Sequence, residues 1–550
     1  MTIPALCLSF AAAACLATLS PSFAETAQVV DAPAGALQGH MDGTIRVFKG
    51  IPYALPPTGA ARWTPPKPMP RWTSTRNADE FGPVCMQPRA TGVNIYASDL
   101  GAMSEDCLFL NIWTPANAQK APVMVWIHGG AFTGGSSSEK LYDGRKLAEH
   151  GIIVVSINYR LGVFGWLAHP ELSAESPLKI SGNYGLLDQI EALRWVKANI
   201  AAFGGDPSNV TIAGESAGGL SVLYLMASPP ARGLFAKAIA ESSYMISMPA
   251  LRESKYGQAA AEDSGAKLMA KLDAKTIADM RAMDASSLST SSLMAGFLPL
   301  GTADGNILPG QLVDIFDKGE QAHVPLLAGY NSGEIRSLTI LAPPTPSSAA
   351  DYEKAIREHY LDLADDYLKL YPSTNMRESI LANTRDALYG WTAERAVRKQ
   401  AAVGQQSFLY AFDHGYPAED NAGLHGFHAS ELPFVFGNTD RTPPYWPGIP
   451  ATDVEAQMSG AMMNYWTSFV RTGVPQADGA PAWASYATAD GQTGFLMDFA
   501  AAPHLVRTAP AMYTLHEQAV CRRKTNGDAP WNWNTGIISP TLMRPKAGCD

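Results

Sequence analysis

The stretch that decides the fold is Val210-Thr211-Ile212-Ala213-Gly214-Glu215-Ser216-Ala217-Gly218-Gly219. Its first four residues are mostly apolar and predict a buried strand, whereas the residues after Ser216 predict the start of a helix. Gly214 and Gly218 leave space for a sharp turn between these elements, and such a turn exposes the serine hydroxyl. The free N–H groups of the new helix point at the same place and favour negative charge on a nearby oxygen. The stretch therefore predicts a nucleophilic serine at position 216.

A second glycine-rich stretch lies upstream and reads His128-Gly129-Gly130-Ala131-Phe132-Thr133-Gly134-Gly135. It directly follows an apolar run that predicts a strand. Closely spaced glycines after a strand allow several backbone N–H groups to point into one cavity, as in an oxyanion hole. An ordinary glycine-rich connection is the alternative. Because the stretch precedes the serine turn in the same chain, we expect it to supply part of an oxyanion hole.

Six short apolar runs, many of them β-branched, predict the strands of a central sheet: residues 123–127, 152–157, 210–213, 236–240, 324–330 and 408–412. Long connections separate them, which favours a mostly parallel sheet covered on both faces. One covering helix is predicted where apolar residues recur every three or four positions from Leu186 to Ile200. Gly204 and Gly205 end this pattern. We therefore expect an α/β fold.

The chain offers no obvious internal boundary. No change in composition, linker or repeat divides residues 25–550, so we expect one large domain with long insertions. Residues 251–298 are rich in Ala, Met, Asp and Ser and predict helices that lie over the sheet edge as part of a cap.

The N-terminal segment predicts export. Residues 1–24 carry no charged side chain, contain an apolar run and end in Ser22-Phe23-Ala24, which suits cleavage by signal peptidase after Ala24. No later run is long enough to span a membrane, so we expect no stable membrane insertion of the mature chain. The protein is then secreted or periplasmic; a short membrane anchor or a wrongly assigned start of the chain is the alternative.

The charge of the chain limits its partners. Only 17% of the 550 residues are charged and the formal net charge is -10. No basic field exists to attract nucleic acid or an anionic membrane surface. A small, neutral or apolar molecule is the expected partner.

Removal of the leader leaves four cysteines, Cys85, Cys107, Cys521 and Cys549. An even, sparse set in an exported chain predicts two disulfides. Pairing of sequence neighbours, Cys85 with Cys107 and Cys521 with Cys549, is one of three possible connectivities, and four free buried thiols are the alternative. No cysteine pair has the spacing of a zinc site, so no metal is expected.

A nucleophilic serine needs a base and an acid that orients the base, and the chain order in this type of site is serine, acid, histidine. His425 and His428 lie in a glycine-containing loop after the 408–412 run, and both remain candidates for the base. Glu334 follows the 324–330 run, at the end of a strand where such sheets place functional groups. It is the candidate acid.

With these residues in view, the sequence resembles the type-B carboxylesterase and cholinesterase family of α/β-hydrolases over nearly all of residues 25–550. The most specific similarity lies in residues 203–219 and in Ser104-Glu105-Asp106-Cys107-Leu108-Phe109-Leu110-Asn111-Ile112-Trp113-Thr114-Pro115. Residues 47–54, 158–162 and 183–189 add to it. The resemblance implies the α/β-hydrolase fold, with a large, mostly parallel central sheet flanked by helices and helical cap insertions.

The resemblance also assigns roles by motif. Ser216 matches the nucleophile, and Gly130, Ala131 and Ala217 match the backbone N–H donors of the oxyanion hole. Ala131 replaces a glycine of many members, but an alanine that keeps the turn still offers its N–H group. The cysteines that match Cys85 and Cys107 form the first disulfide of the family, whereas Cys521 and Cys549 have no confident counterpart there.

For the base and acid, residues 428–437 match a family stretch in which histidine precedes glutamate by three positions. This similarity selects His428 over His425. The family usually reads Asn-x-Asp-Glu-Gly around its acid, and this chain keeps Asn331 and Glu334 but lacks the Asp and the Gly. Glu334 remains the implied acid because a carboxylate on that loop suffices to orient the histidine. Asp304 is the reserve.

The expected activity is hydrolysis of a small-molecule carboxylic ester through an acyl-enzyme intermediate, with a Ser-Glu-His triad and no cofactor. A non-catalytic, esterase-like binding or adhesion protein is one alternative. The same fold acting on amide, thioester or carbonate bonds is another. Four aromatic residues near the motifs are candidates to line the acyl or alcohol pocket, with packing in the core as the alternative: Phe132, Trp166, Tyr244 and Phe434.

Overall fold

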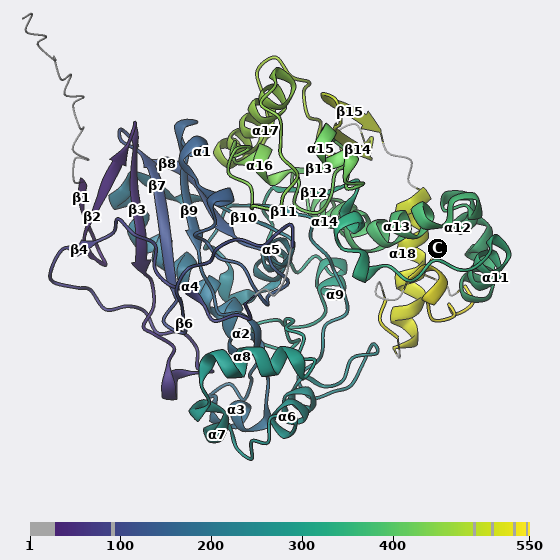
Figure 1. Ribbon diagram of the computed structural model, residues 1–550, viewed down its shortest axis with the longest axis horizontal. Coiled ribbons are helices and arrows are strands. Elements are labelled where there is room, and N and C mark those ends of the chain that lie inside the picture. The colour runs from purple at the N-terminus through teal and green to yellow at the C-terminus, as the bar shows by residue number, and fades with distance from the viewer. Residues whose placement is uncertain are drawn as a thin grey trace, which may run out of the picture.

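The computed structural model of the protein describes residues 28–89, 94–487, 491–507, 511–527, 529–531, 535–545 and 548–549. The predicted signal peptide, residues 1–24, lies outside the described residues. Figure 1 shows a central sheet with helices on both sides and two helical groups at the periphery.

The middle of the sheet is parallel. Its strands follow the order β9 (Ile153–Ile157), β8 (Ala121–Ile127), β10 (Gly205–Glu215), β11 (Lys237–Glu241), β12 (Leu326–Asn331), β13 (Ser407–Phe412) and β14 (Phe495–Phe499). Each neighbouring pair in this block is parallel. All six apolar runs singled out in the sequence fall on these strands, so the predicted mostly parallel sheet is confirmed.

Antiparallel strands extend the sheet at both edges. On the side of β9 they are β1 (Gln28–Ala32), β2 (Gly35–Asp42), β3 (Ile45–Pro52) and β7 (Phe109–Pro115), and on the other side β15 (Pro503–Arg507) pairs with β14. The short β4 (Arg76–Asn77) pairs with β2, while β5 (Val84–Cys85) and β6 (Met103–Ser104) form a separate two-stranded sheet. Sequence patterning did not indicate these edge strands.

Helices cover both faces of the sheet. Because neighbouring side chains of a strand point to opposite faces, Val123 and Val125 of β8 belong to one core cluster and Met124 to another. The first cluster includes α4 (Tyr184–Asn199) and α5 (Ala217–Ala227), and the second includes α16 (Leu432–Val435) and α17 (Asp453–Thr472). The predicted amphipathic helix is α4.

The end of α4 follows the sequence expectation. A 3-10 turn, Ile200–Phe203, continues the helix, and Gly204 then adopts a left-handed backbone with φ of 89°. A residue with a side chain is strained in that conformation, which explains the glycine. Gly205 then begins β10.

The predicted cap helices form the first peripheral group, at the bottom of Figure 1. They are α6 (Ala261–Lys271), α7 (Ile277–Ala282) and α8 (Ala285–Met294). α8 packs against α2 (Gly162–Trp166), and α6 packs against α3 (Pro170–Glu175). Residues 251–298 are therefore largely helical, as the composition predicted.

The second peripheral group, at the right of Figure 1, consists of α11 (Ala349–Tyr360), α12 (Ala364–Leu370), α13 (Met376–Arg385) and α18 (Ala511–Asn526). It has its own small core, rich in tyrosine. The remaining helices are α1 (Arg145–Glu149), α9 (Leu312–Asp317), α10 (Glu334–Ser337), α14 (Trp391–Ala402) and α15 (Pro417–Asn421).

Two disulfides fasten the periphery. Cys85 and Cys107 are bonded, with Cα atoms 4.9 Å apart, and so are Cys521 and Cys549, with Cα atoms 5.5 Å apart. These are the two sequence-local pairs expected above. The second bond ties α18 to the C-terminal residues.

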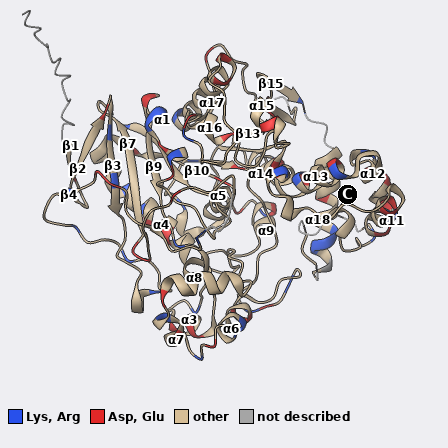
Figure 2. Cartoon of the chain, in the orientation of Figure 1, with Lys and Arg blue, Asp and Glu red and all other residues tan. Residues whose placement is uncertain are grey.

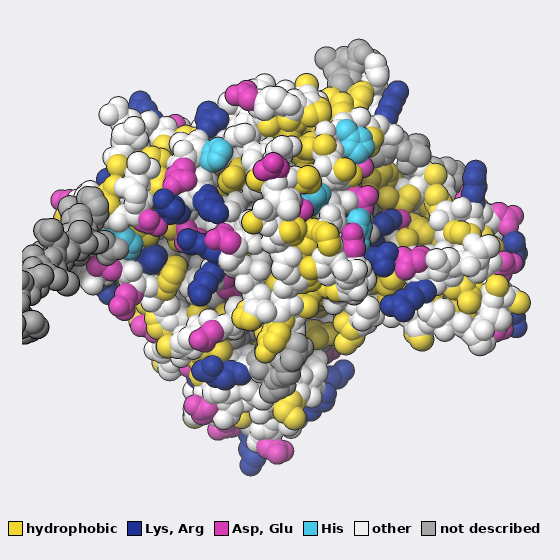
Figure 3. Space-filling view, turned by 45° about the horizontal axis from the view of Figure 1, so that its top comes forward, with side chains coloured by type: hydrophobic (Ala, Val, Ile, Leu, Met, Phe, Trp, Pro, Cys, Tyr) yellow, Lys and Arg dark blue, Asp and Glu magenta, His cyan; other side chains and the backbone are white. Residues whose placement is uncertain are grey.

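Charged residues lie mainly on the outer helices and loops, with few in the central strands (Figure 2). On the face seen in Figure 3, acidic and basic side chains are interspersed with hydrophobic ones. Within the described ranges, no helix combines the length and apolarity that crossing a bilayer requires.

Candidate active site

Ser216 lies on the turn between β10 and α5. Its backbone has φ of 57°, which is unusual for a residue with a side chain. Its N–H donates to the carbonyl of Glu241 at 3.0 Å, and its own carbonyl accepts from Leu220 in the first turn of α5. These bonds hold the strained backbone of the turn that the sequence motif predicts, and Ser216 itself is buried, at 9% exposure.

Gly214 and Gly218, on either side of the serine, have no room for a side chain. A Cβ atom on Gly214 would lie 2.6 Å from the carbonyl of Gly218. A Cβ on Gly218 would lie 2.0 Å from the carbonyl oxygen of Ile127, the last residue of β8. Strand and helix therefore meet too closely for any side chain at these two positions.

The glycine-rich stretch after β8 forms a tight loop beside Ser216. Gly130, Ala131 and Phe132 all have positive φ, at 100°, 53° and 57°, and the carbonyl of Gly130 accepts from the N–H of Gly134 at 3.0 Å. A Cβ on Gly129 would lie 3.1 Å from the Cβ of Ser216, so the loop borders the serine directly.

Three backbone donors around the serine are available. Within the described part of the chain, the structure gives no hydrogen-bond acceptor to the N–H groups of Gly130, Ala131 and Ala217. Ala217 is the first residue of α5, where N–H groups have no partner inside the helix. The three predicted oxyanion-hole residues thus offer free donors near Ser216.

His428 and Glu334 form a buried pair. Nδ1 of His428 is hydrogen-bonded to Oε2 of Glu334, and the two residues are 6% and 0% exposed. Glu334 begins α10, just after β12, and its other oxygen accepts from the N–H of Asn331 at 2.9 Å. The Asn331 side chain also donates to the carbonyl of Phe427 at 2.8 Å, which joins the loop of the acid to the loop of the histidine.

His425 and Asp304, the other candidates for the base and the acid, have other partners. His425 is 42% exposed at its side chain, and its Nδ1 contacts Asp420 at 2.6 Å while its Nε2 contacts Asp413 at 3.3 Å. Partial burial lowers the pKa of His425, but these carboxylates outweigh that effect and raise it. Asp304 accepts three backbone N–H groups of its own turn, between 2.8 and 3.2 Å, and the side chain of Asn183.

The other ring nitrogen of His428 faces a residue that sequence reasoning missed. Nε2 lies 3.1 Å from Oε1 of Glu215, the residue before the serine. Burial raises the pKa of Glu215 well above its usual value, and the neighbouring carboxylates of Glu334 and Glu241 add to the effect. Its place beside Ser216 in the motif was the only signal in the sequence.

Glu215 belongs to a cluster of buried carboxyl groups. Burial, followed by the charge of Glu215, raises the pKa of Glu431 well above its usual value. Burial also raises the pKa of Glu241 to about 8, although a hydrogen bond from Trp466 opposes this shift. Burial and the mutual repulsion of adjacent carboxylates both favour the neutral form of these three side chains.

The aromatic residues proposed for the substrate pocket divide into two kinds. Phe132, Trp166 and Phe434 are at most 2% exposed and belong to the core, so they do not line an open pocket. Tyr244 is partly exposed and packs edge-to-face on Tyr389, at 6.0 Å between ring centroids. The Tyr389 ring lies in turn 5.3 Å from the ring of His428.

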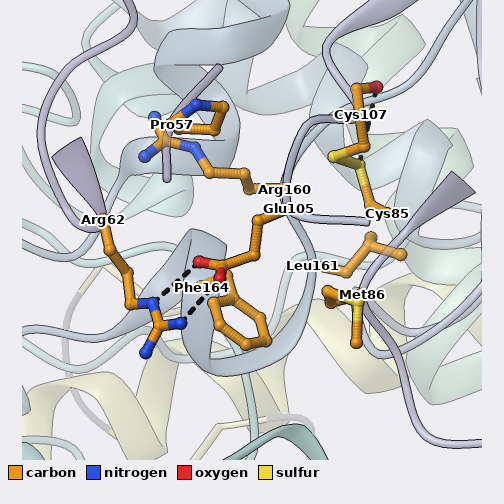
Figure 4. Close-up of a pocket in the computed structure, with 9 residues that line it drawn as sticks. All are labelled: Pro57, Arg62, Cys85, Met86, Glu105, Cys107, Arg160, Leu161 and Phe164. Carbon is orange, nitrogen blue, oxygen red and sulfur yellow. Dashed lines mark hydrogen bonds and ion pairs between the residues drawn. A yellow bond between two sulfur atoms is a disulfide. The ribbon is translucent and has the colours of Figure 1, made fainter. Parts of the chain in front are cut away.

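A small pocket lies next to the first disulfide (Figure 4). In Figure 4 the guanidinium of Arg62 points at the carboxylate of Glu105, with contacts of 2.6 and 2.7 Å. Arg160, also in the lining, is paired with buried Asp188. The lining contains none of the predicted catalytic residues, and its charges are already satisfied.

In the described residues, no group of three or more His, Cys, Asp and Glu side chains is arranged to hold a metal ion.

Comparisons with known proteins agree with this geometry. A family model described as "Carboxylesterase family" matches residues 26–509. The fumonisin B1 esterase of Sphingopyxis macrogoltabida is 35% identical, over 82% of this chain and 83% of its own length. The para-nitrobenzyl esterase of Bacillus subtilis is 36% identical, over 84% of this chain and 93% of its own.

Solved structures give the same result. A para-nitrobenzyl (PNB) esterase superimposes with a TM-score of 0.74 at 32% identity, covering 88% of this chain and 97% of that one. A carboxylesterase of Geobacillus stearothermophilus gives 0.71 at 33% identity, covering 88% and 98%. The chain therefore belongs to the carboxylesterase family and is a carboxylic ester hydrolase with the α/β-hydrolase fold.

Proposed function

We propose that this ester hydrolase uses Ser216 as nucleophile, His428 as general base and Glu334 as the acid that orients the base. The observation that carries the proposal is the buried hydrogen bond from Nδ1 of His428 to Glu334, next to the strained turn of Ser216. A fully buried carboxylate on Nδ1 fixes the tautomer and stabilises the imidazolium that forms during catalysis.

The reaction proceeds in two steps. Nε2 of His428 takes the hydroxyl proton of Ser216 while the Ser216 Oγ attacks the ester carbonyl. His428 then gives this proton to the leaving alcohol as the C–O bond breaks. In the second step His428 takes a proton from water, the hydroxide attacks the acyl-enzyme, and the carboxylic acid leaves as the proton returns to Ser216.

The free N–H groups of Gly130, Ala131 and Ala217 are the proposed oxyanion hole. The loop that carries the first two borders Ser216, and the tight loop and the helix start fix the positions of all three before substrate arrives, which supports this role. Removing one such donor from a comparable site costs about 10²- to 10³-fold in turnover.

In the resting site Nε2 of His428 contacts Glu215, not the serine hydroxyl. Catalysis therefore requires this nitrogen to exchange the Glu215 contact for Oγ of Ser216, the next residue in the chain. Catalytic hydrogen bonds are often misaligned before substrate binds and tighten in the complex.

Three variants test the triad. His428→Ala should nearly abolish hydrolysis of a chromogenic ester, whereas His425→Ala should keep kcat/KM within about tenfold of wild type. Glu334→Gln should lower kcat strongly with the fold intact. An inactive His425→Ala enzyme would place the base elsewhere, and a fully active Glu334→Gln enzyme would point to another carboxylate, such as Asp304.

The bond that is cleaved can be tested on matched substrates. We propose a carboxylic ester of a small molecule, as the names of the relatives indicate for those proteins. A series with the same acyl group in ester, thioester, carbonate and amide linkage should show the highest kcat/KM for the ester. A higher value for another linkage would change the assigned chemistry, and no turnover of any of them would favour a binding protein.

We propose also that residues 1–24 act as a signal peptide and that residues 25–550 form one exported domain. The two disulfides support export, because such bonds persist in oxidising compartments. Mass spectrometry of protein from the periplasm or medium should find Glu25 as the first residue. Recovery of a chain starting at Met1 from the cytoplasm alone would contradict the proposal.

A further inference from the structure

A tyrosine of the loop closed by the first disulfide contacts the segments that carry the proposed base and acid. Tyr96 lies between Cys85 and Cys107 in the sequence, and its hydroxyl is 2.9 Å from the carbonyl oxygen of His428. The same hydroxyl lies 2.7 Å from Oγ of Ser337. Ser337 is the last residue of α10, the helix that begins with Glu334. One hydroxyl thus touches the segments of both the base and the acid.

The direction of these two hydrogen bonds follows from chemistry. A carbonyl oxygen only accepts, so the single phenolic proton of Tyr96 is donated to His428. The hydroxyl of Ser337 must then donate to Tyr96. Burial raises the pKa of Tyr96 well above its usual value, which keeps the phenol protonated and a donor throughout the working pH range.

The carbonyl that accepts from Tyr96 belongs to a peptide that needs support. Ala429, the next residue, has φ of 69°, a left-handed conformation that is unfavourable for a residue with a side chain. Such strain persists only where the surroundings impose it. The bond from Tyr96 restrains the His428–Ala429 peptide, which belongs to the backbone that carries the imidazole.

The ring of Tyr96 is held independently of its hydroxyl. It packs edge-to-face on Trp446 with centroids 6.0 Å apart and lies 6.4 Å from the ring of Phe427. Phe427 and Trp446 pack on each other at 4.6 Å. A phenylalanine at position 96 would keep this packing and lose only the hydrogen bonds.

We propose that Tyr96 is a positioning residue that fixes His428 and Glu334 relative to each other, through its bonds to the His428 carbonyl and to Ser337. The proposal rests on the function proposed above, because it assumes that His428 is the base and Glu334 its partner. It gives the loop closed by the first disulfide a part in catalysis, although this loop lies far from the triad in the sequence.

The test is Tyr96→Phe, with kcat, KM and the pH profile of kcat/KM measured together. We expect kcat to fall about tenfold with KM changed less than twofold. We also expect the acid limb of the profile to move to lower pH, because a looser contact with Glu334 stabilises the protonated base less. A purely structural role would not move that limb.

Tyr352→Phe is the matched control. The hydroxyl of Tyr352 also donates to a backbone carbonyl at 2.9 Å, that of Tyr371, in the peripheral helical group. Its loss should lower the thermal midpoint about as much as Tyr96→Phe does, with kcat and the pH profile unchanged.

Ser337→Ala separates the two bonds of Tyr96. It keeps the bond to His428, so kcat should fall less than in Tyr96→Phe, and the double variant should be no slower than Tyr96→Phe alone. Wild-type kcat in Tyr96→Phe, or a lower kcat with an unmoved acid limb, would overturn the inference. Full activity of Ser216→Ala or His428→Ala would instead overturn the proposed function, whatever Tyr96→Phe shows.

Discussion

Replacement of Gly218 by alanine tests whether the close approach of β8 and α5 sets the catalytic geometry. The new Cβ would lie 2.0 Å from the carbonyl oxygen of Ile127, about 1.4 Å short of the 3.4 Å at which ordinary contact begins. Either the end of β8 or the start of α5 must therefore move by about 1 Å. The end of β8 leads into the loop with Gly130 and Ala131, and the start of α5 carries Ser216 and Ala217. A misplacement of this size typically costs about 10²-fold in rate.

The assay is kcat/KM on a chromogenic ester, normalised to the folded fraction from circular dichroism. We expect a loss of about 100-fold, equivalent to about 2.7 kcal/mol of transition-state stabilisation. Gly460→Ala is the control, because nothing lies within 4 Å of a Cβ at this helical position. It should raise stability by about 0.5–1 kcal/mol and leave kcat/KM unchanged. A folded Gly218→Ala enzyme with wild-type kcat/KM would refute the argument.

Two further predictions concern stability. Burial raises the pKa of Glu139 from 4.5 to about 7, although N–H of Ser136 and the hydroxyl of Ser98 donate to it. The stability that protonated Glu139 contributes is present below pH 4.5 and is lost as pH rises through about 7. Because this side chain is only partly shielded, Glu139→Gln should raise the unfolding free energy by about 1–2 kcal/mol at pH 8 and by little at pH 4.5. Thermal unfolding measures both values, and equal gains at the two pH values would contradict the prediction. Replacing Cys85 and Cys107 by serine opens a loop with a sequence separation of 22 and should lower the unfolding free energy by about 3 kcal/mol, seen as a lower denaturation midpoint; an unchanged midpoint would mean that the bond adds no constraint.

The sequence predicted the parallel centre of the fold except for β14, because the other strands there contain buried, mostly apolar runs. β14 was missed, since its five residues include Asp498 and two half-buried positions. The edge strands were not predicted, because they lack such continuous apolar runs. β2 reads Gly-Ala-Leu-Gln-Gly-His-Met-Asp, with buried and half-buried residues in alternation. A run of that composition, with two glycines and no β-branched residue, does not differ from a loop until its partners are known.

In the candidate site, Ser216 was predicted from the glycines around it, at positions that admit no Cβ. The positions of strand ends predicted Glu334 and either His425 or His428, and the resemblance then selected His428. The contacts that complete the site, from Glu215 and Tyr96, are not visible in any local pattern. Tyr96 meets His428 across 332 positions of sequence, so only the fold brings them together. The aromatic candidates were wrong for Phe132, Trp166 and Phe434, because aromatic residues near a motif fill the core more often than they line a pocket.

The central claim is that Ser216 forms the covalent bond to the substrate. The most direct measurement is mass spectrometry after treatment with a serine-directed organophosphorus ester, together with the kinetics of Ser216→Ala. We predict one adduct per chain, on the peptide that contains Ser216, in proportion to lost activity. Ser216→Ala should take up no adduct and lose several orders of magnitude in turnover while remaining folded. An adduct on another residue that abolishes activity, or substantial turnover by Ser216→Ala, would contradict the account.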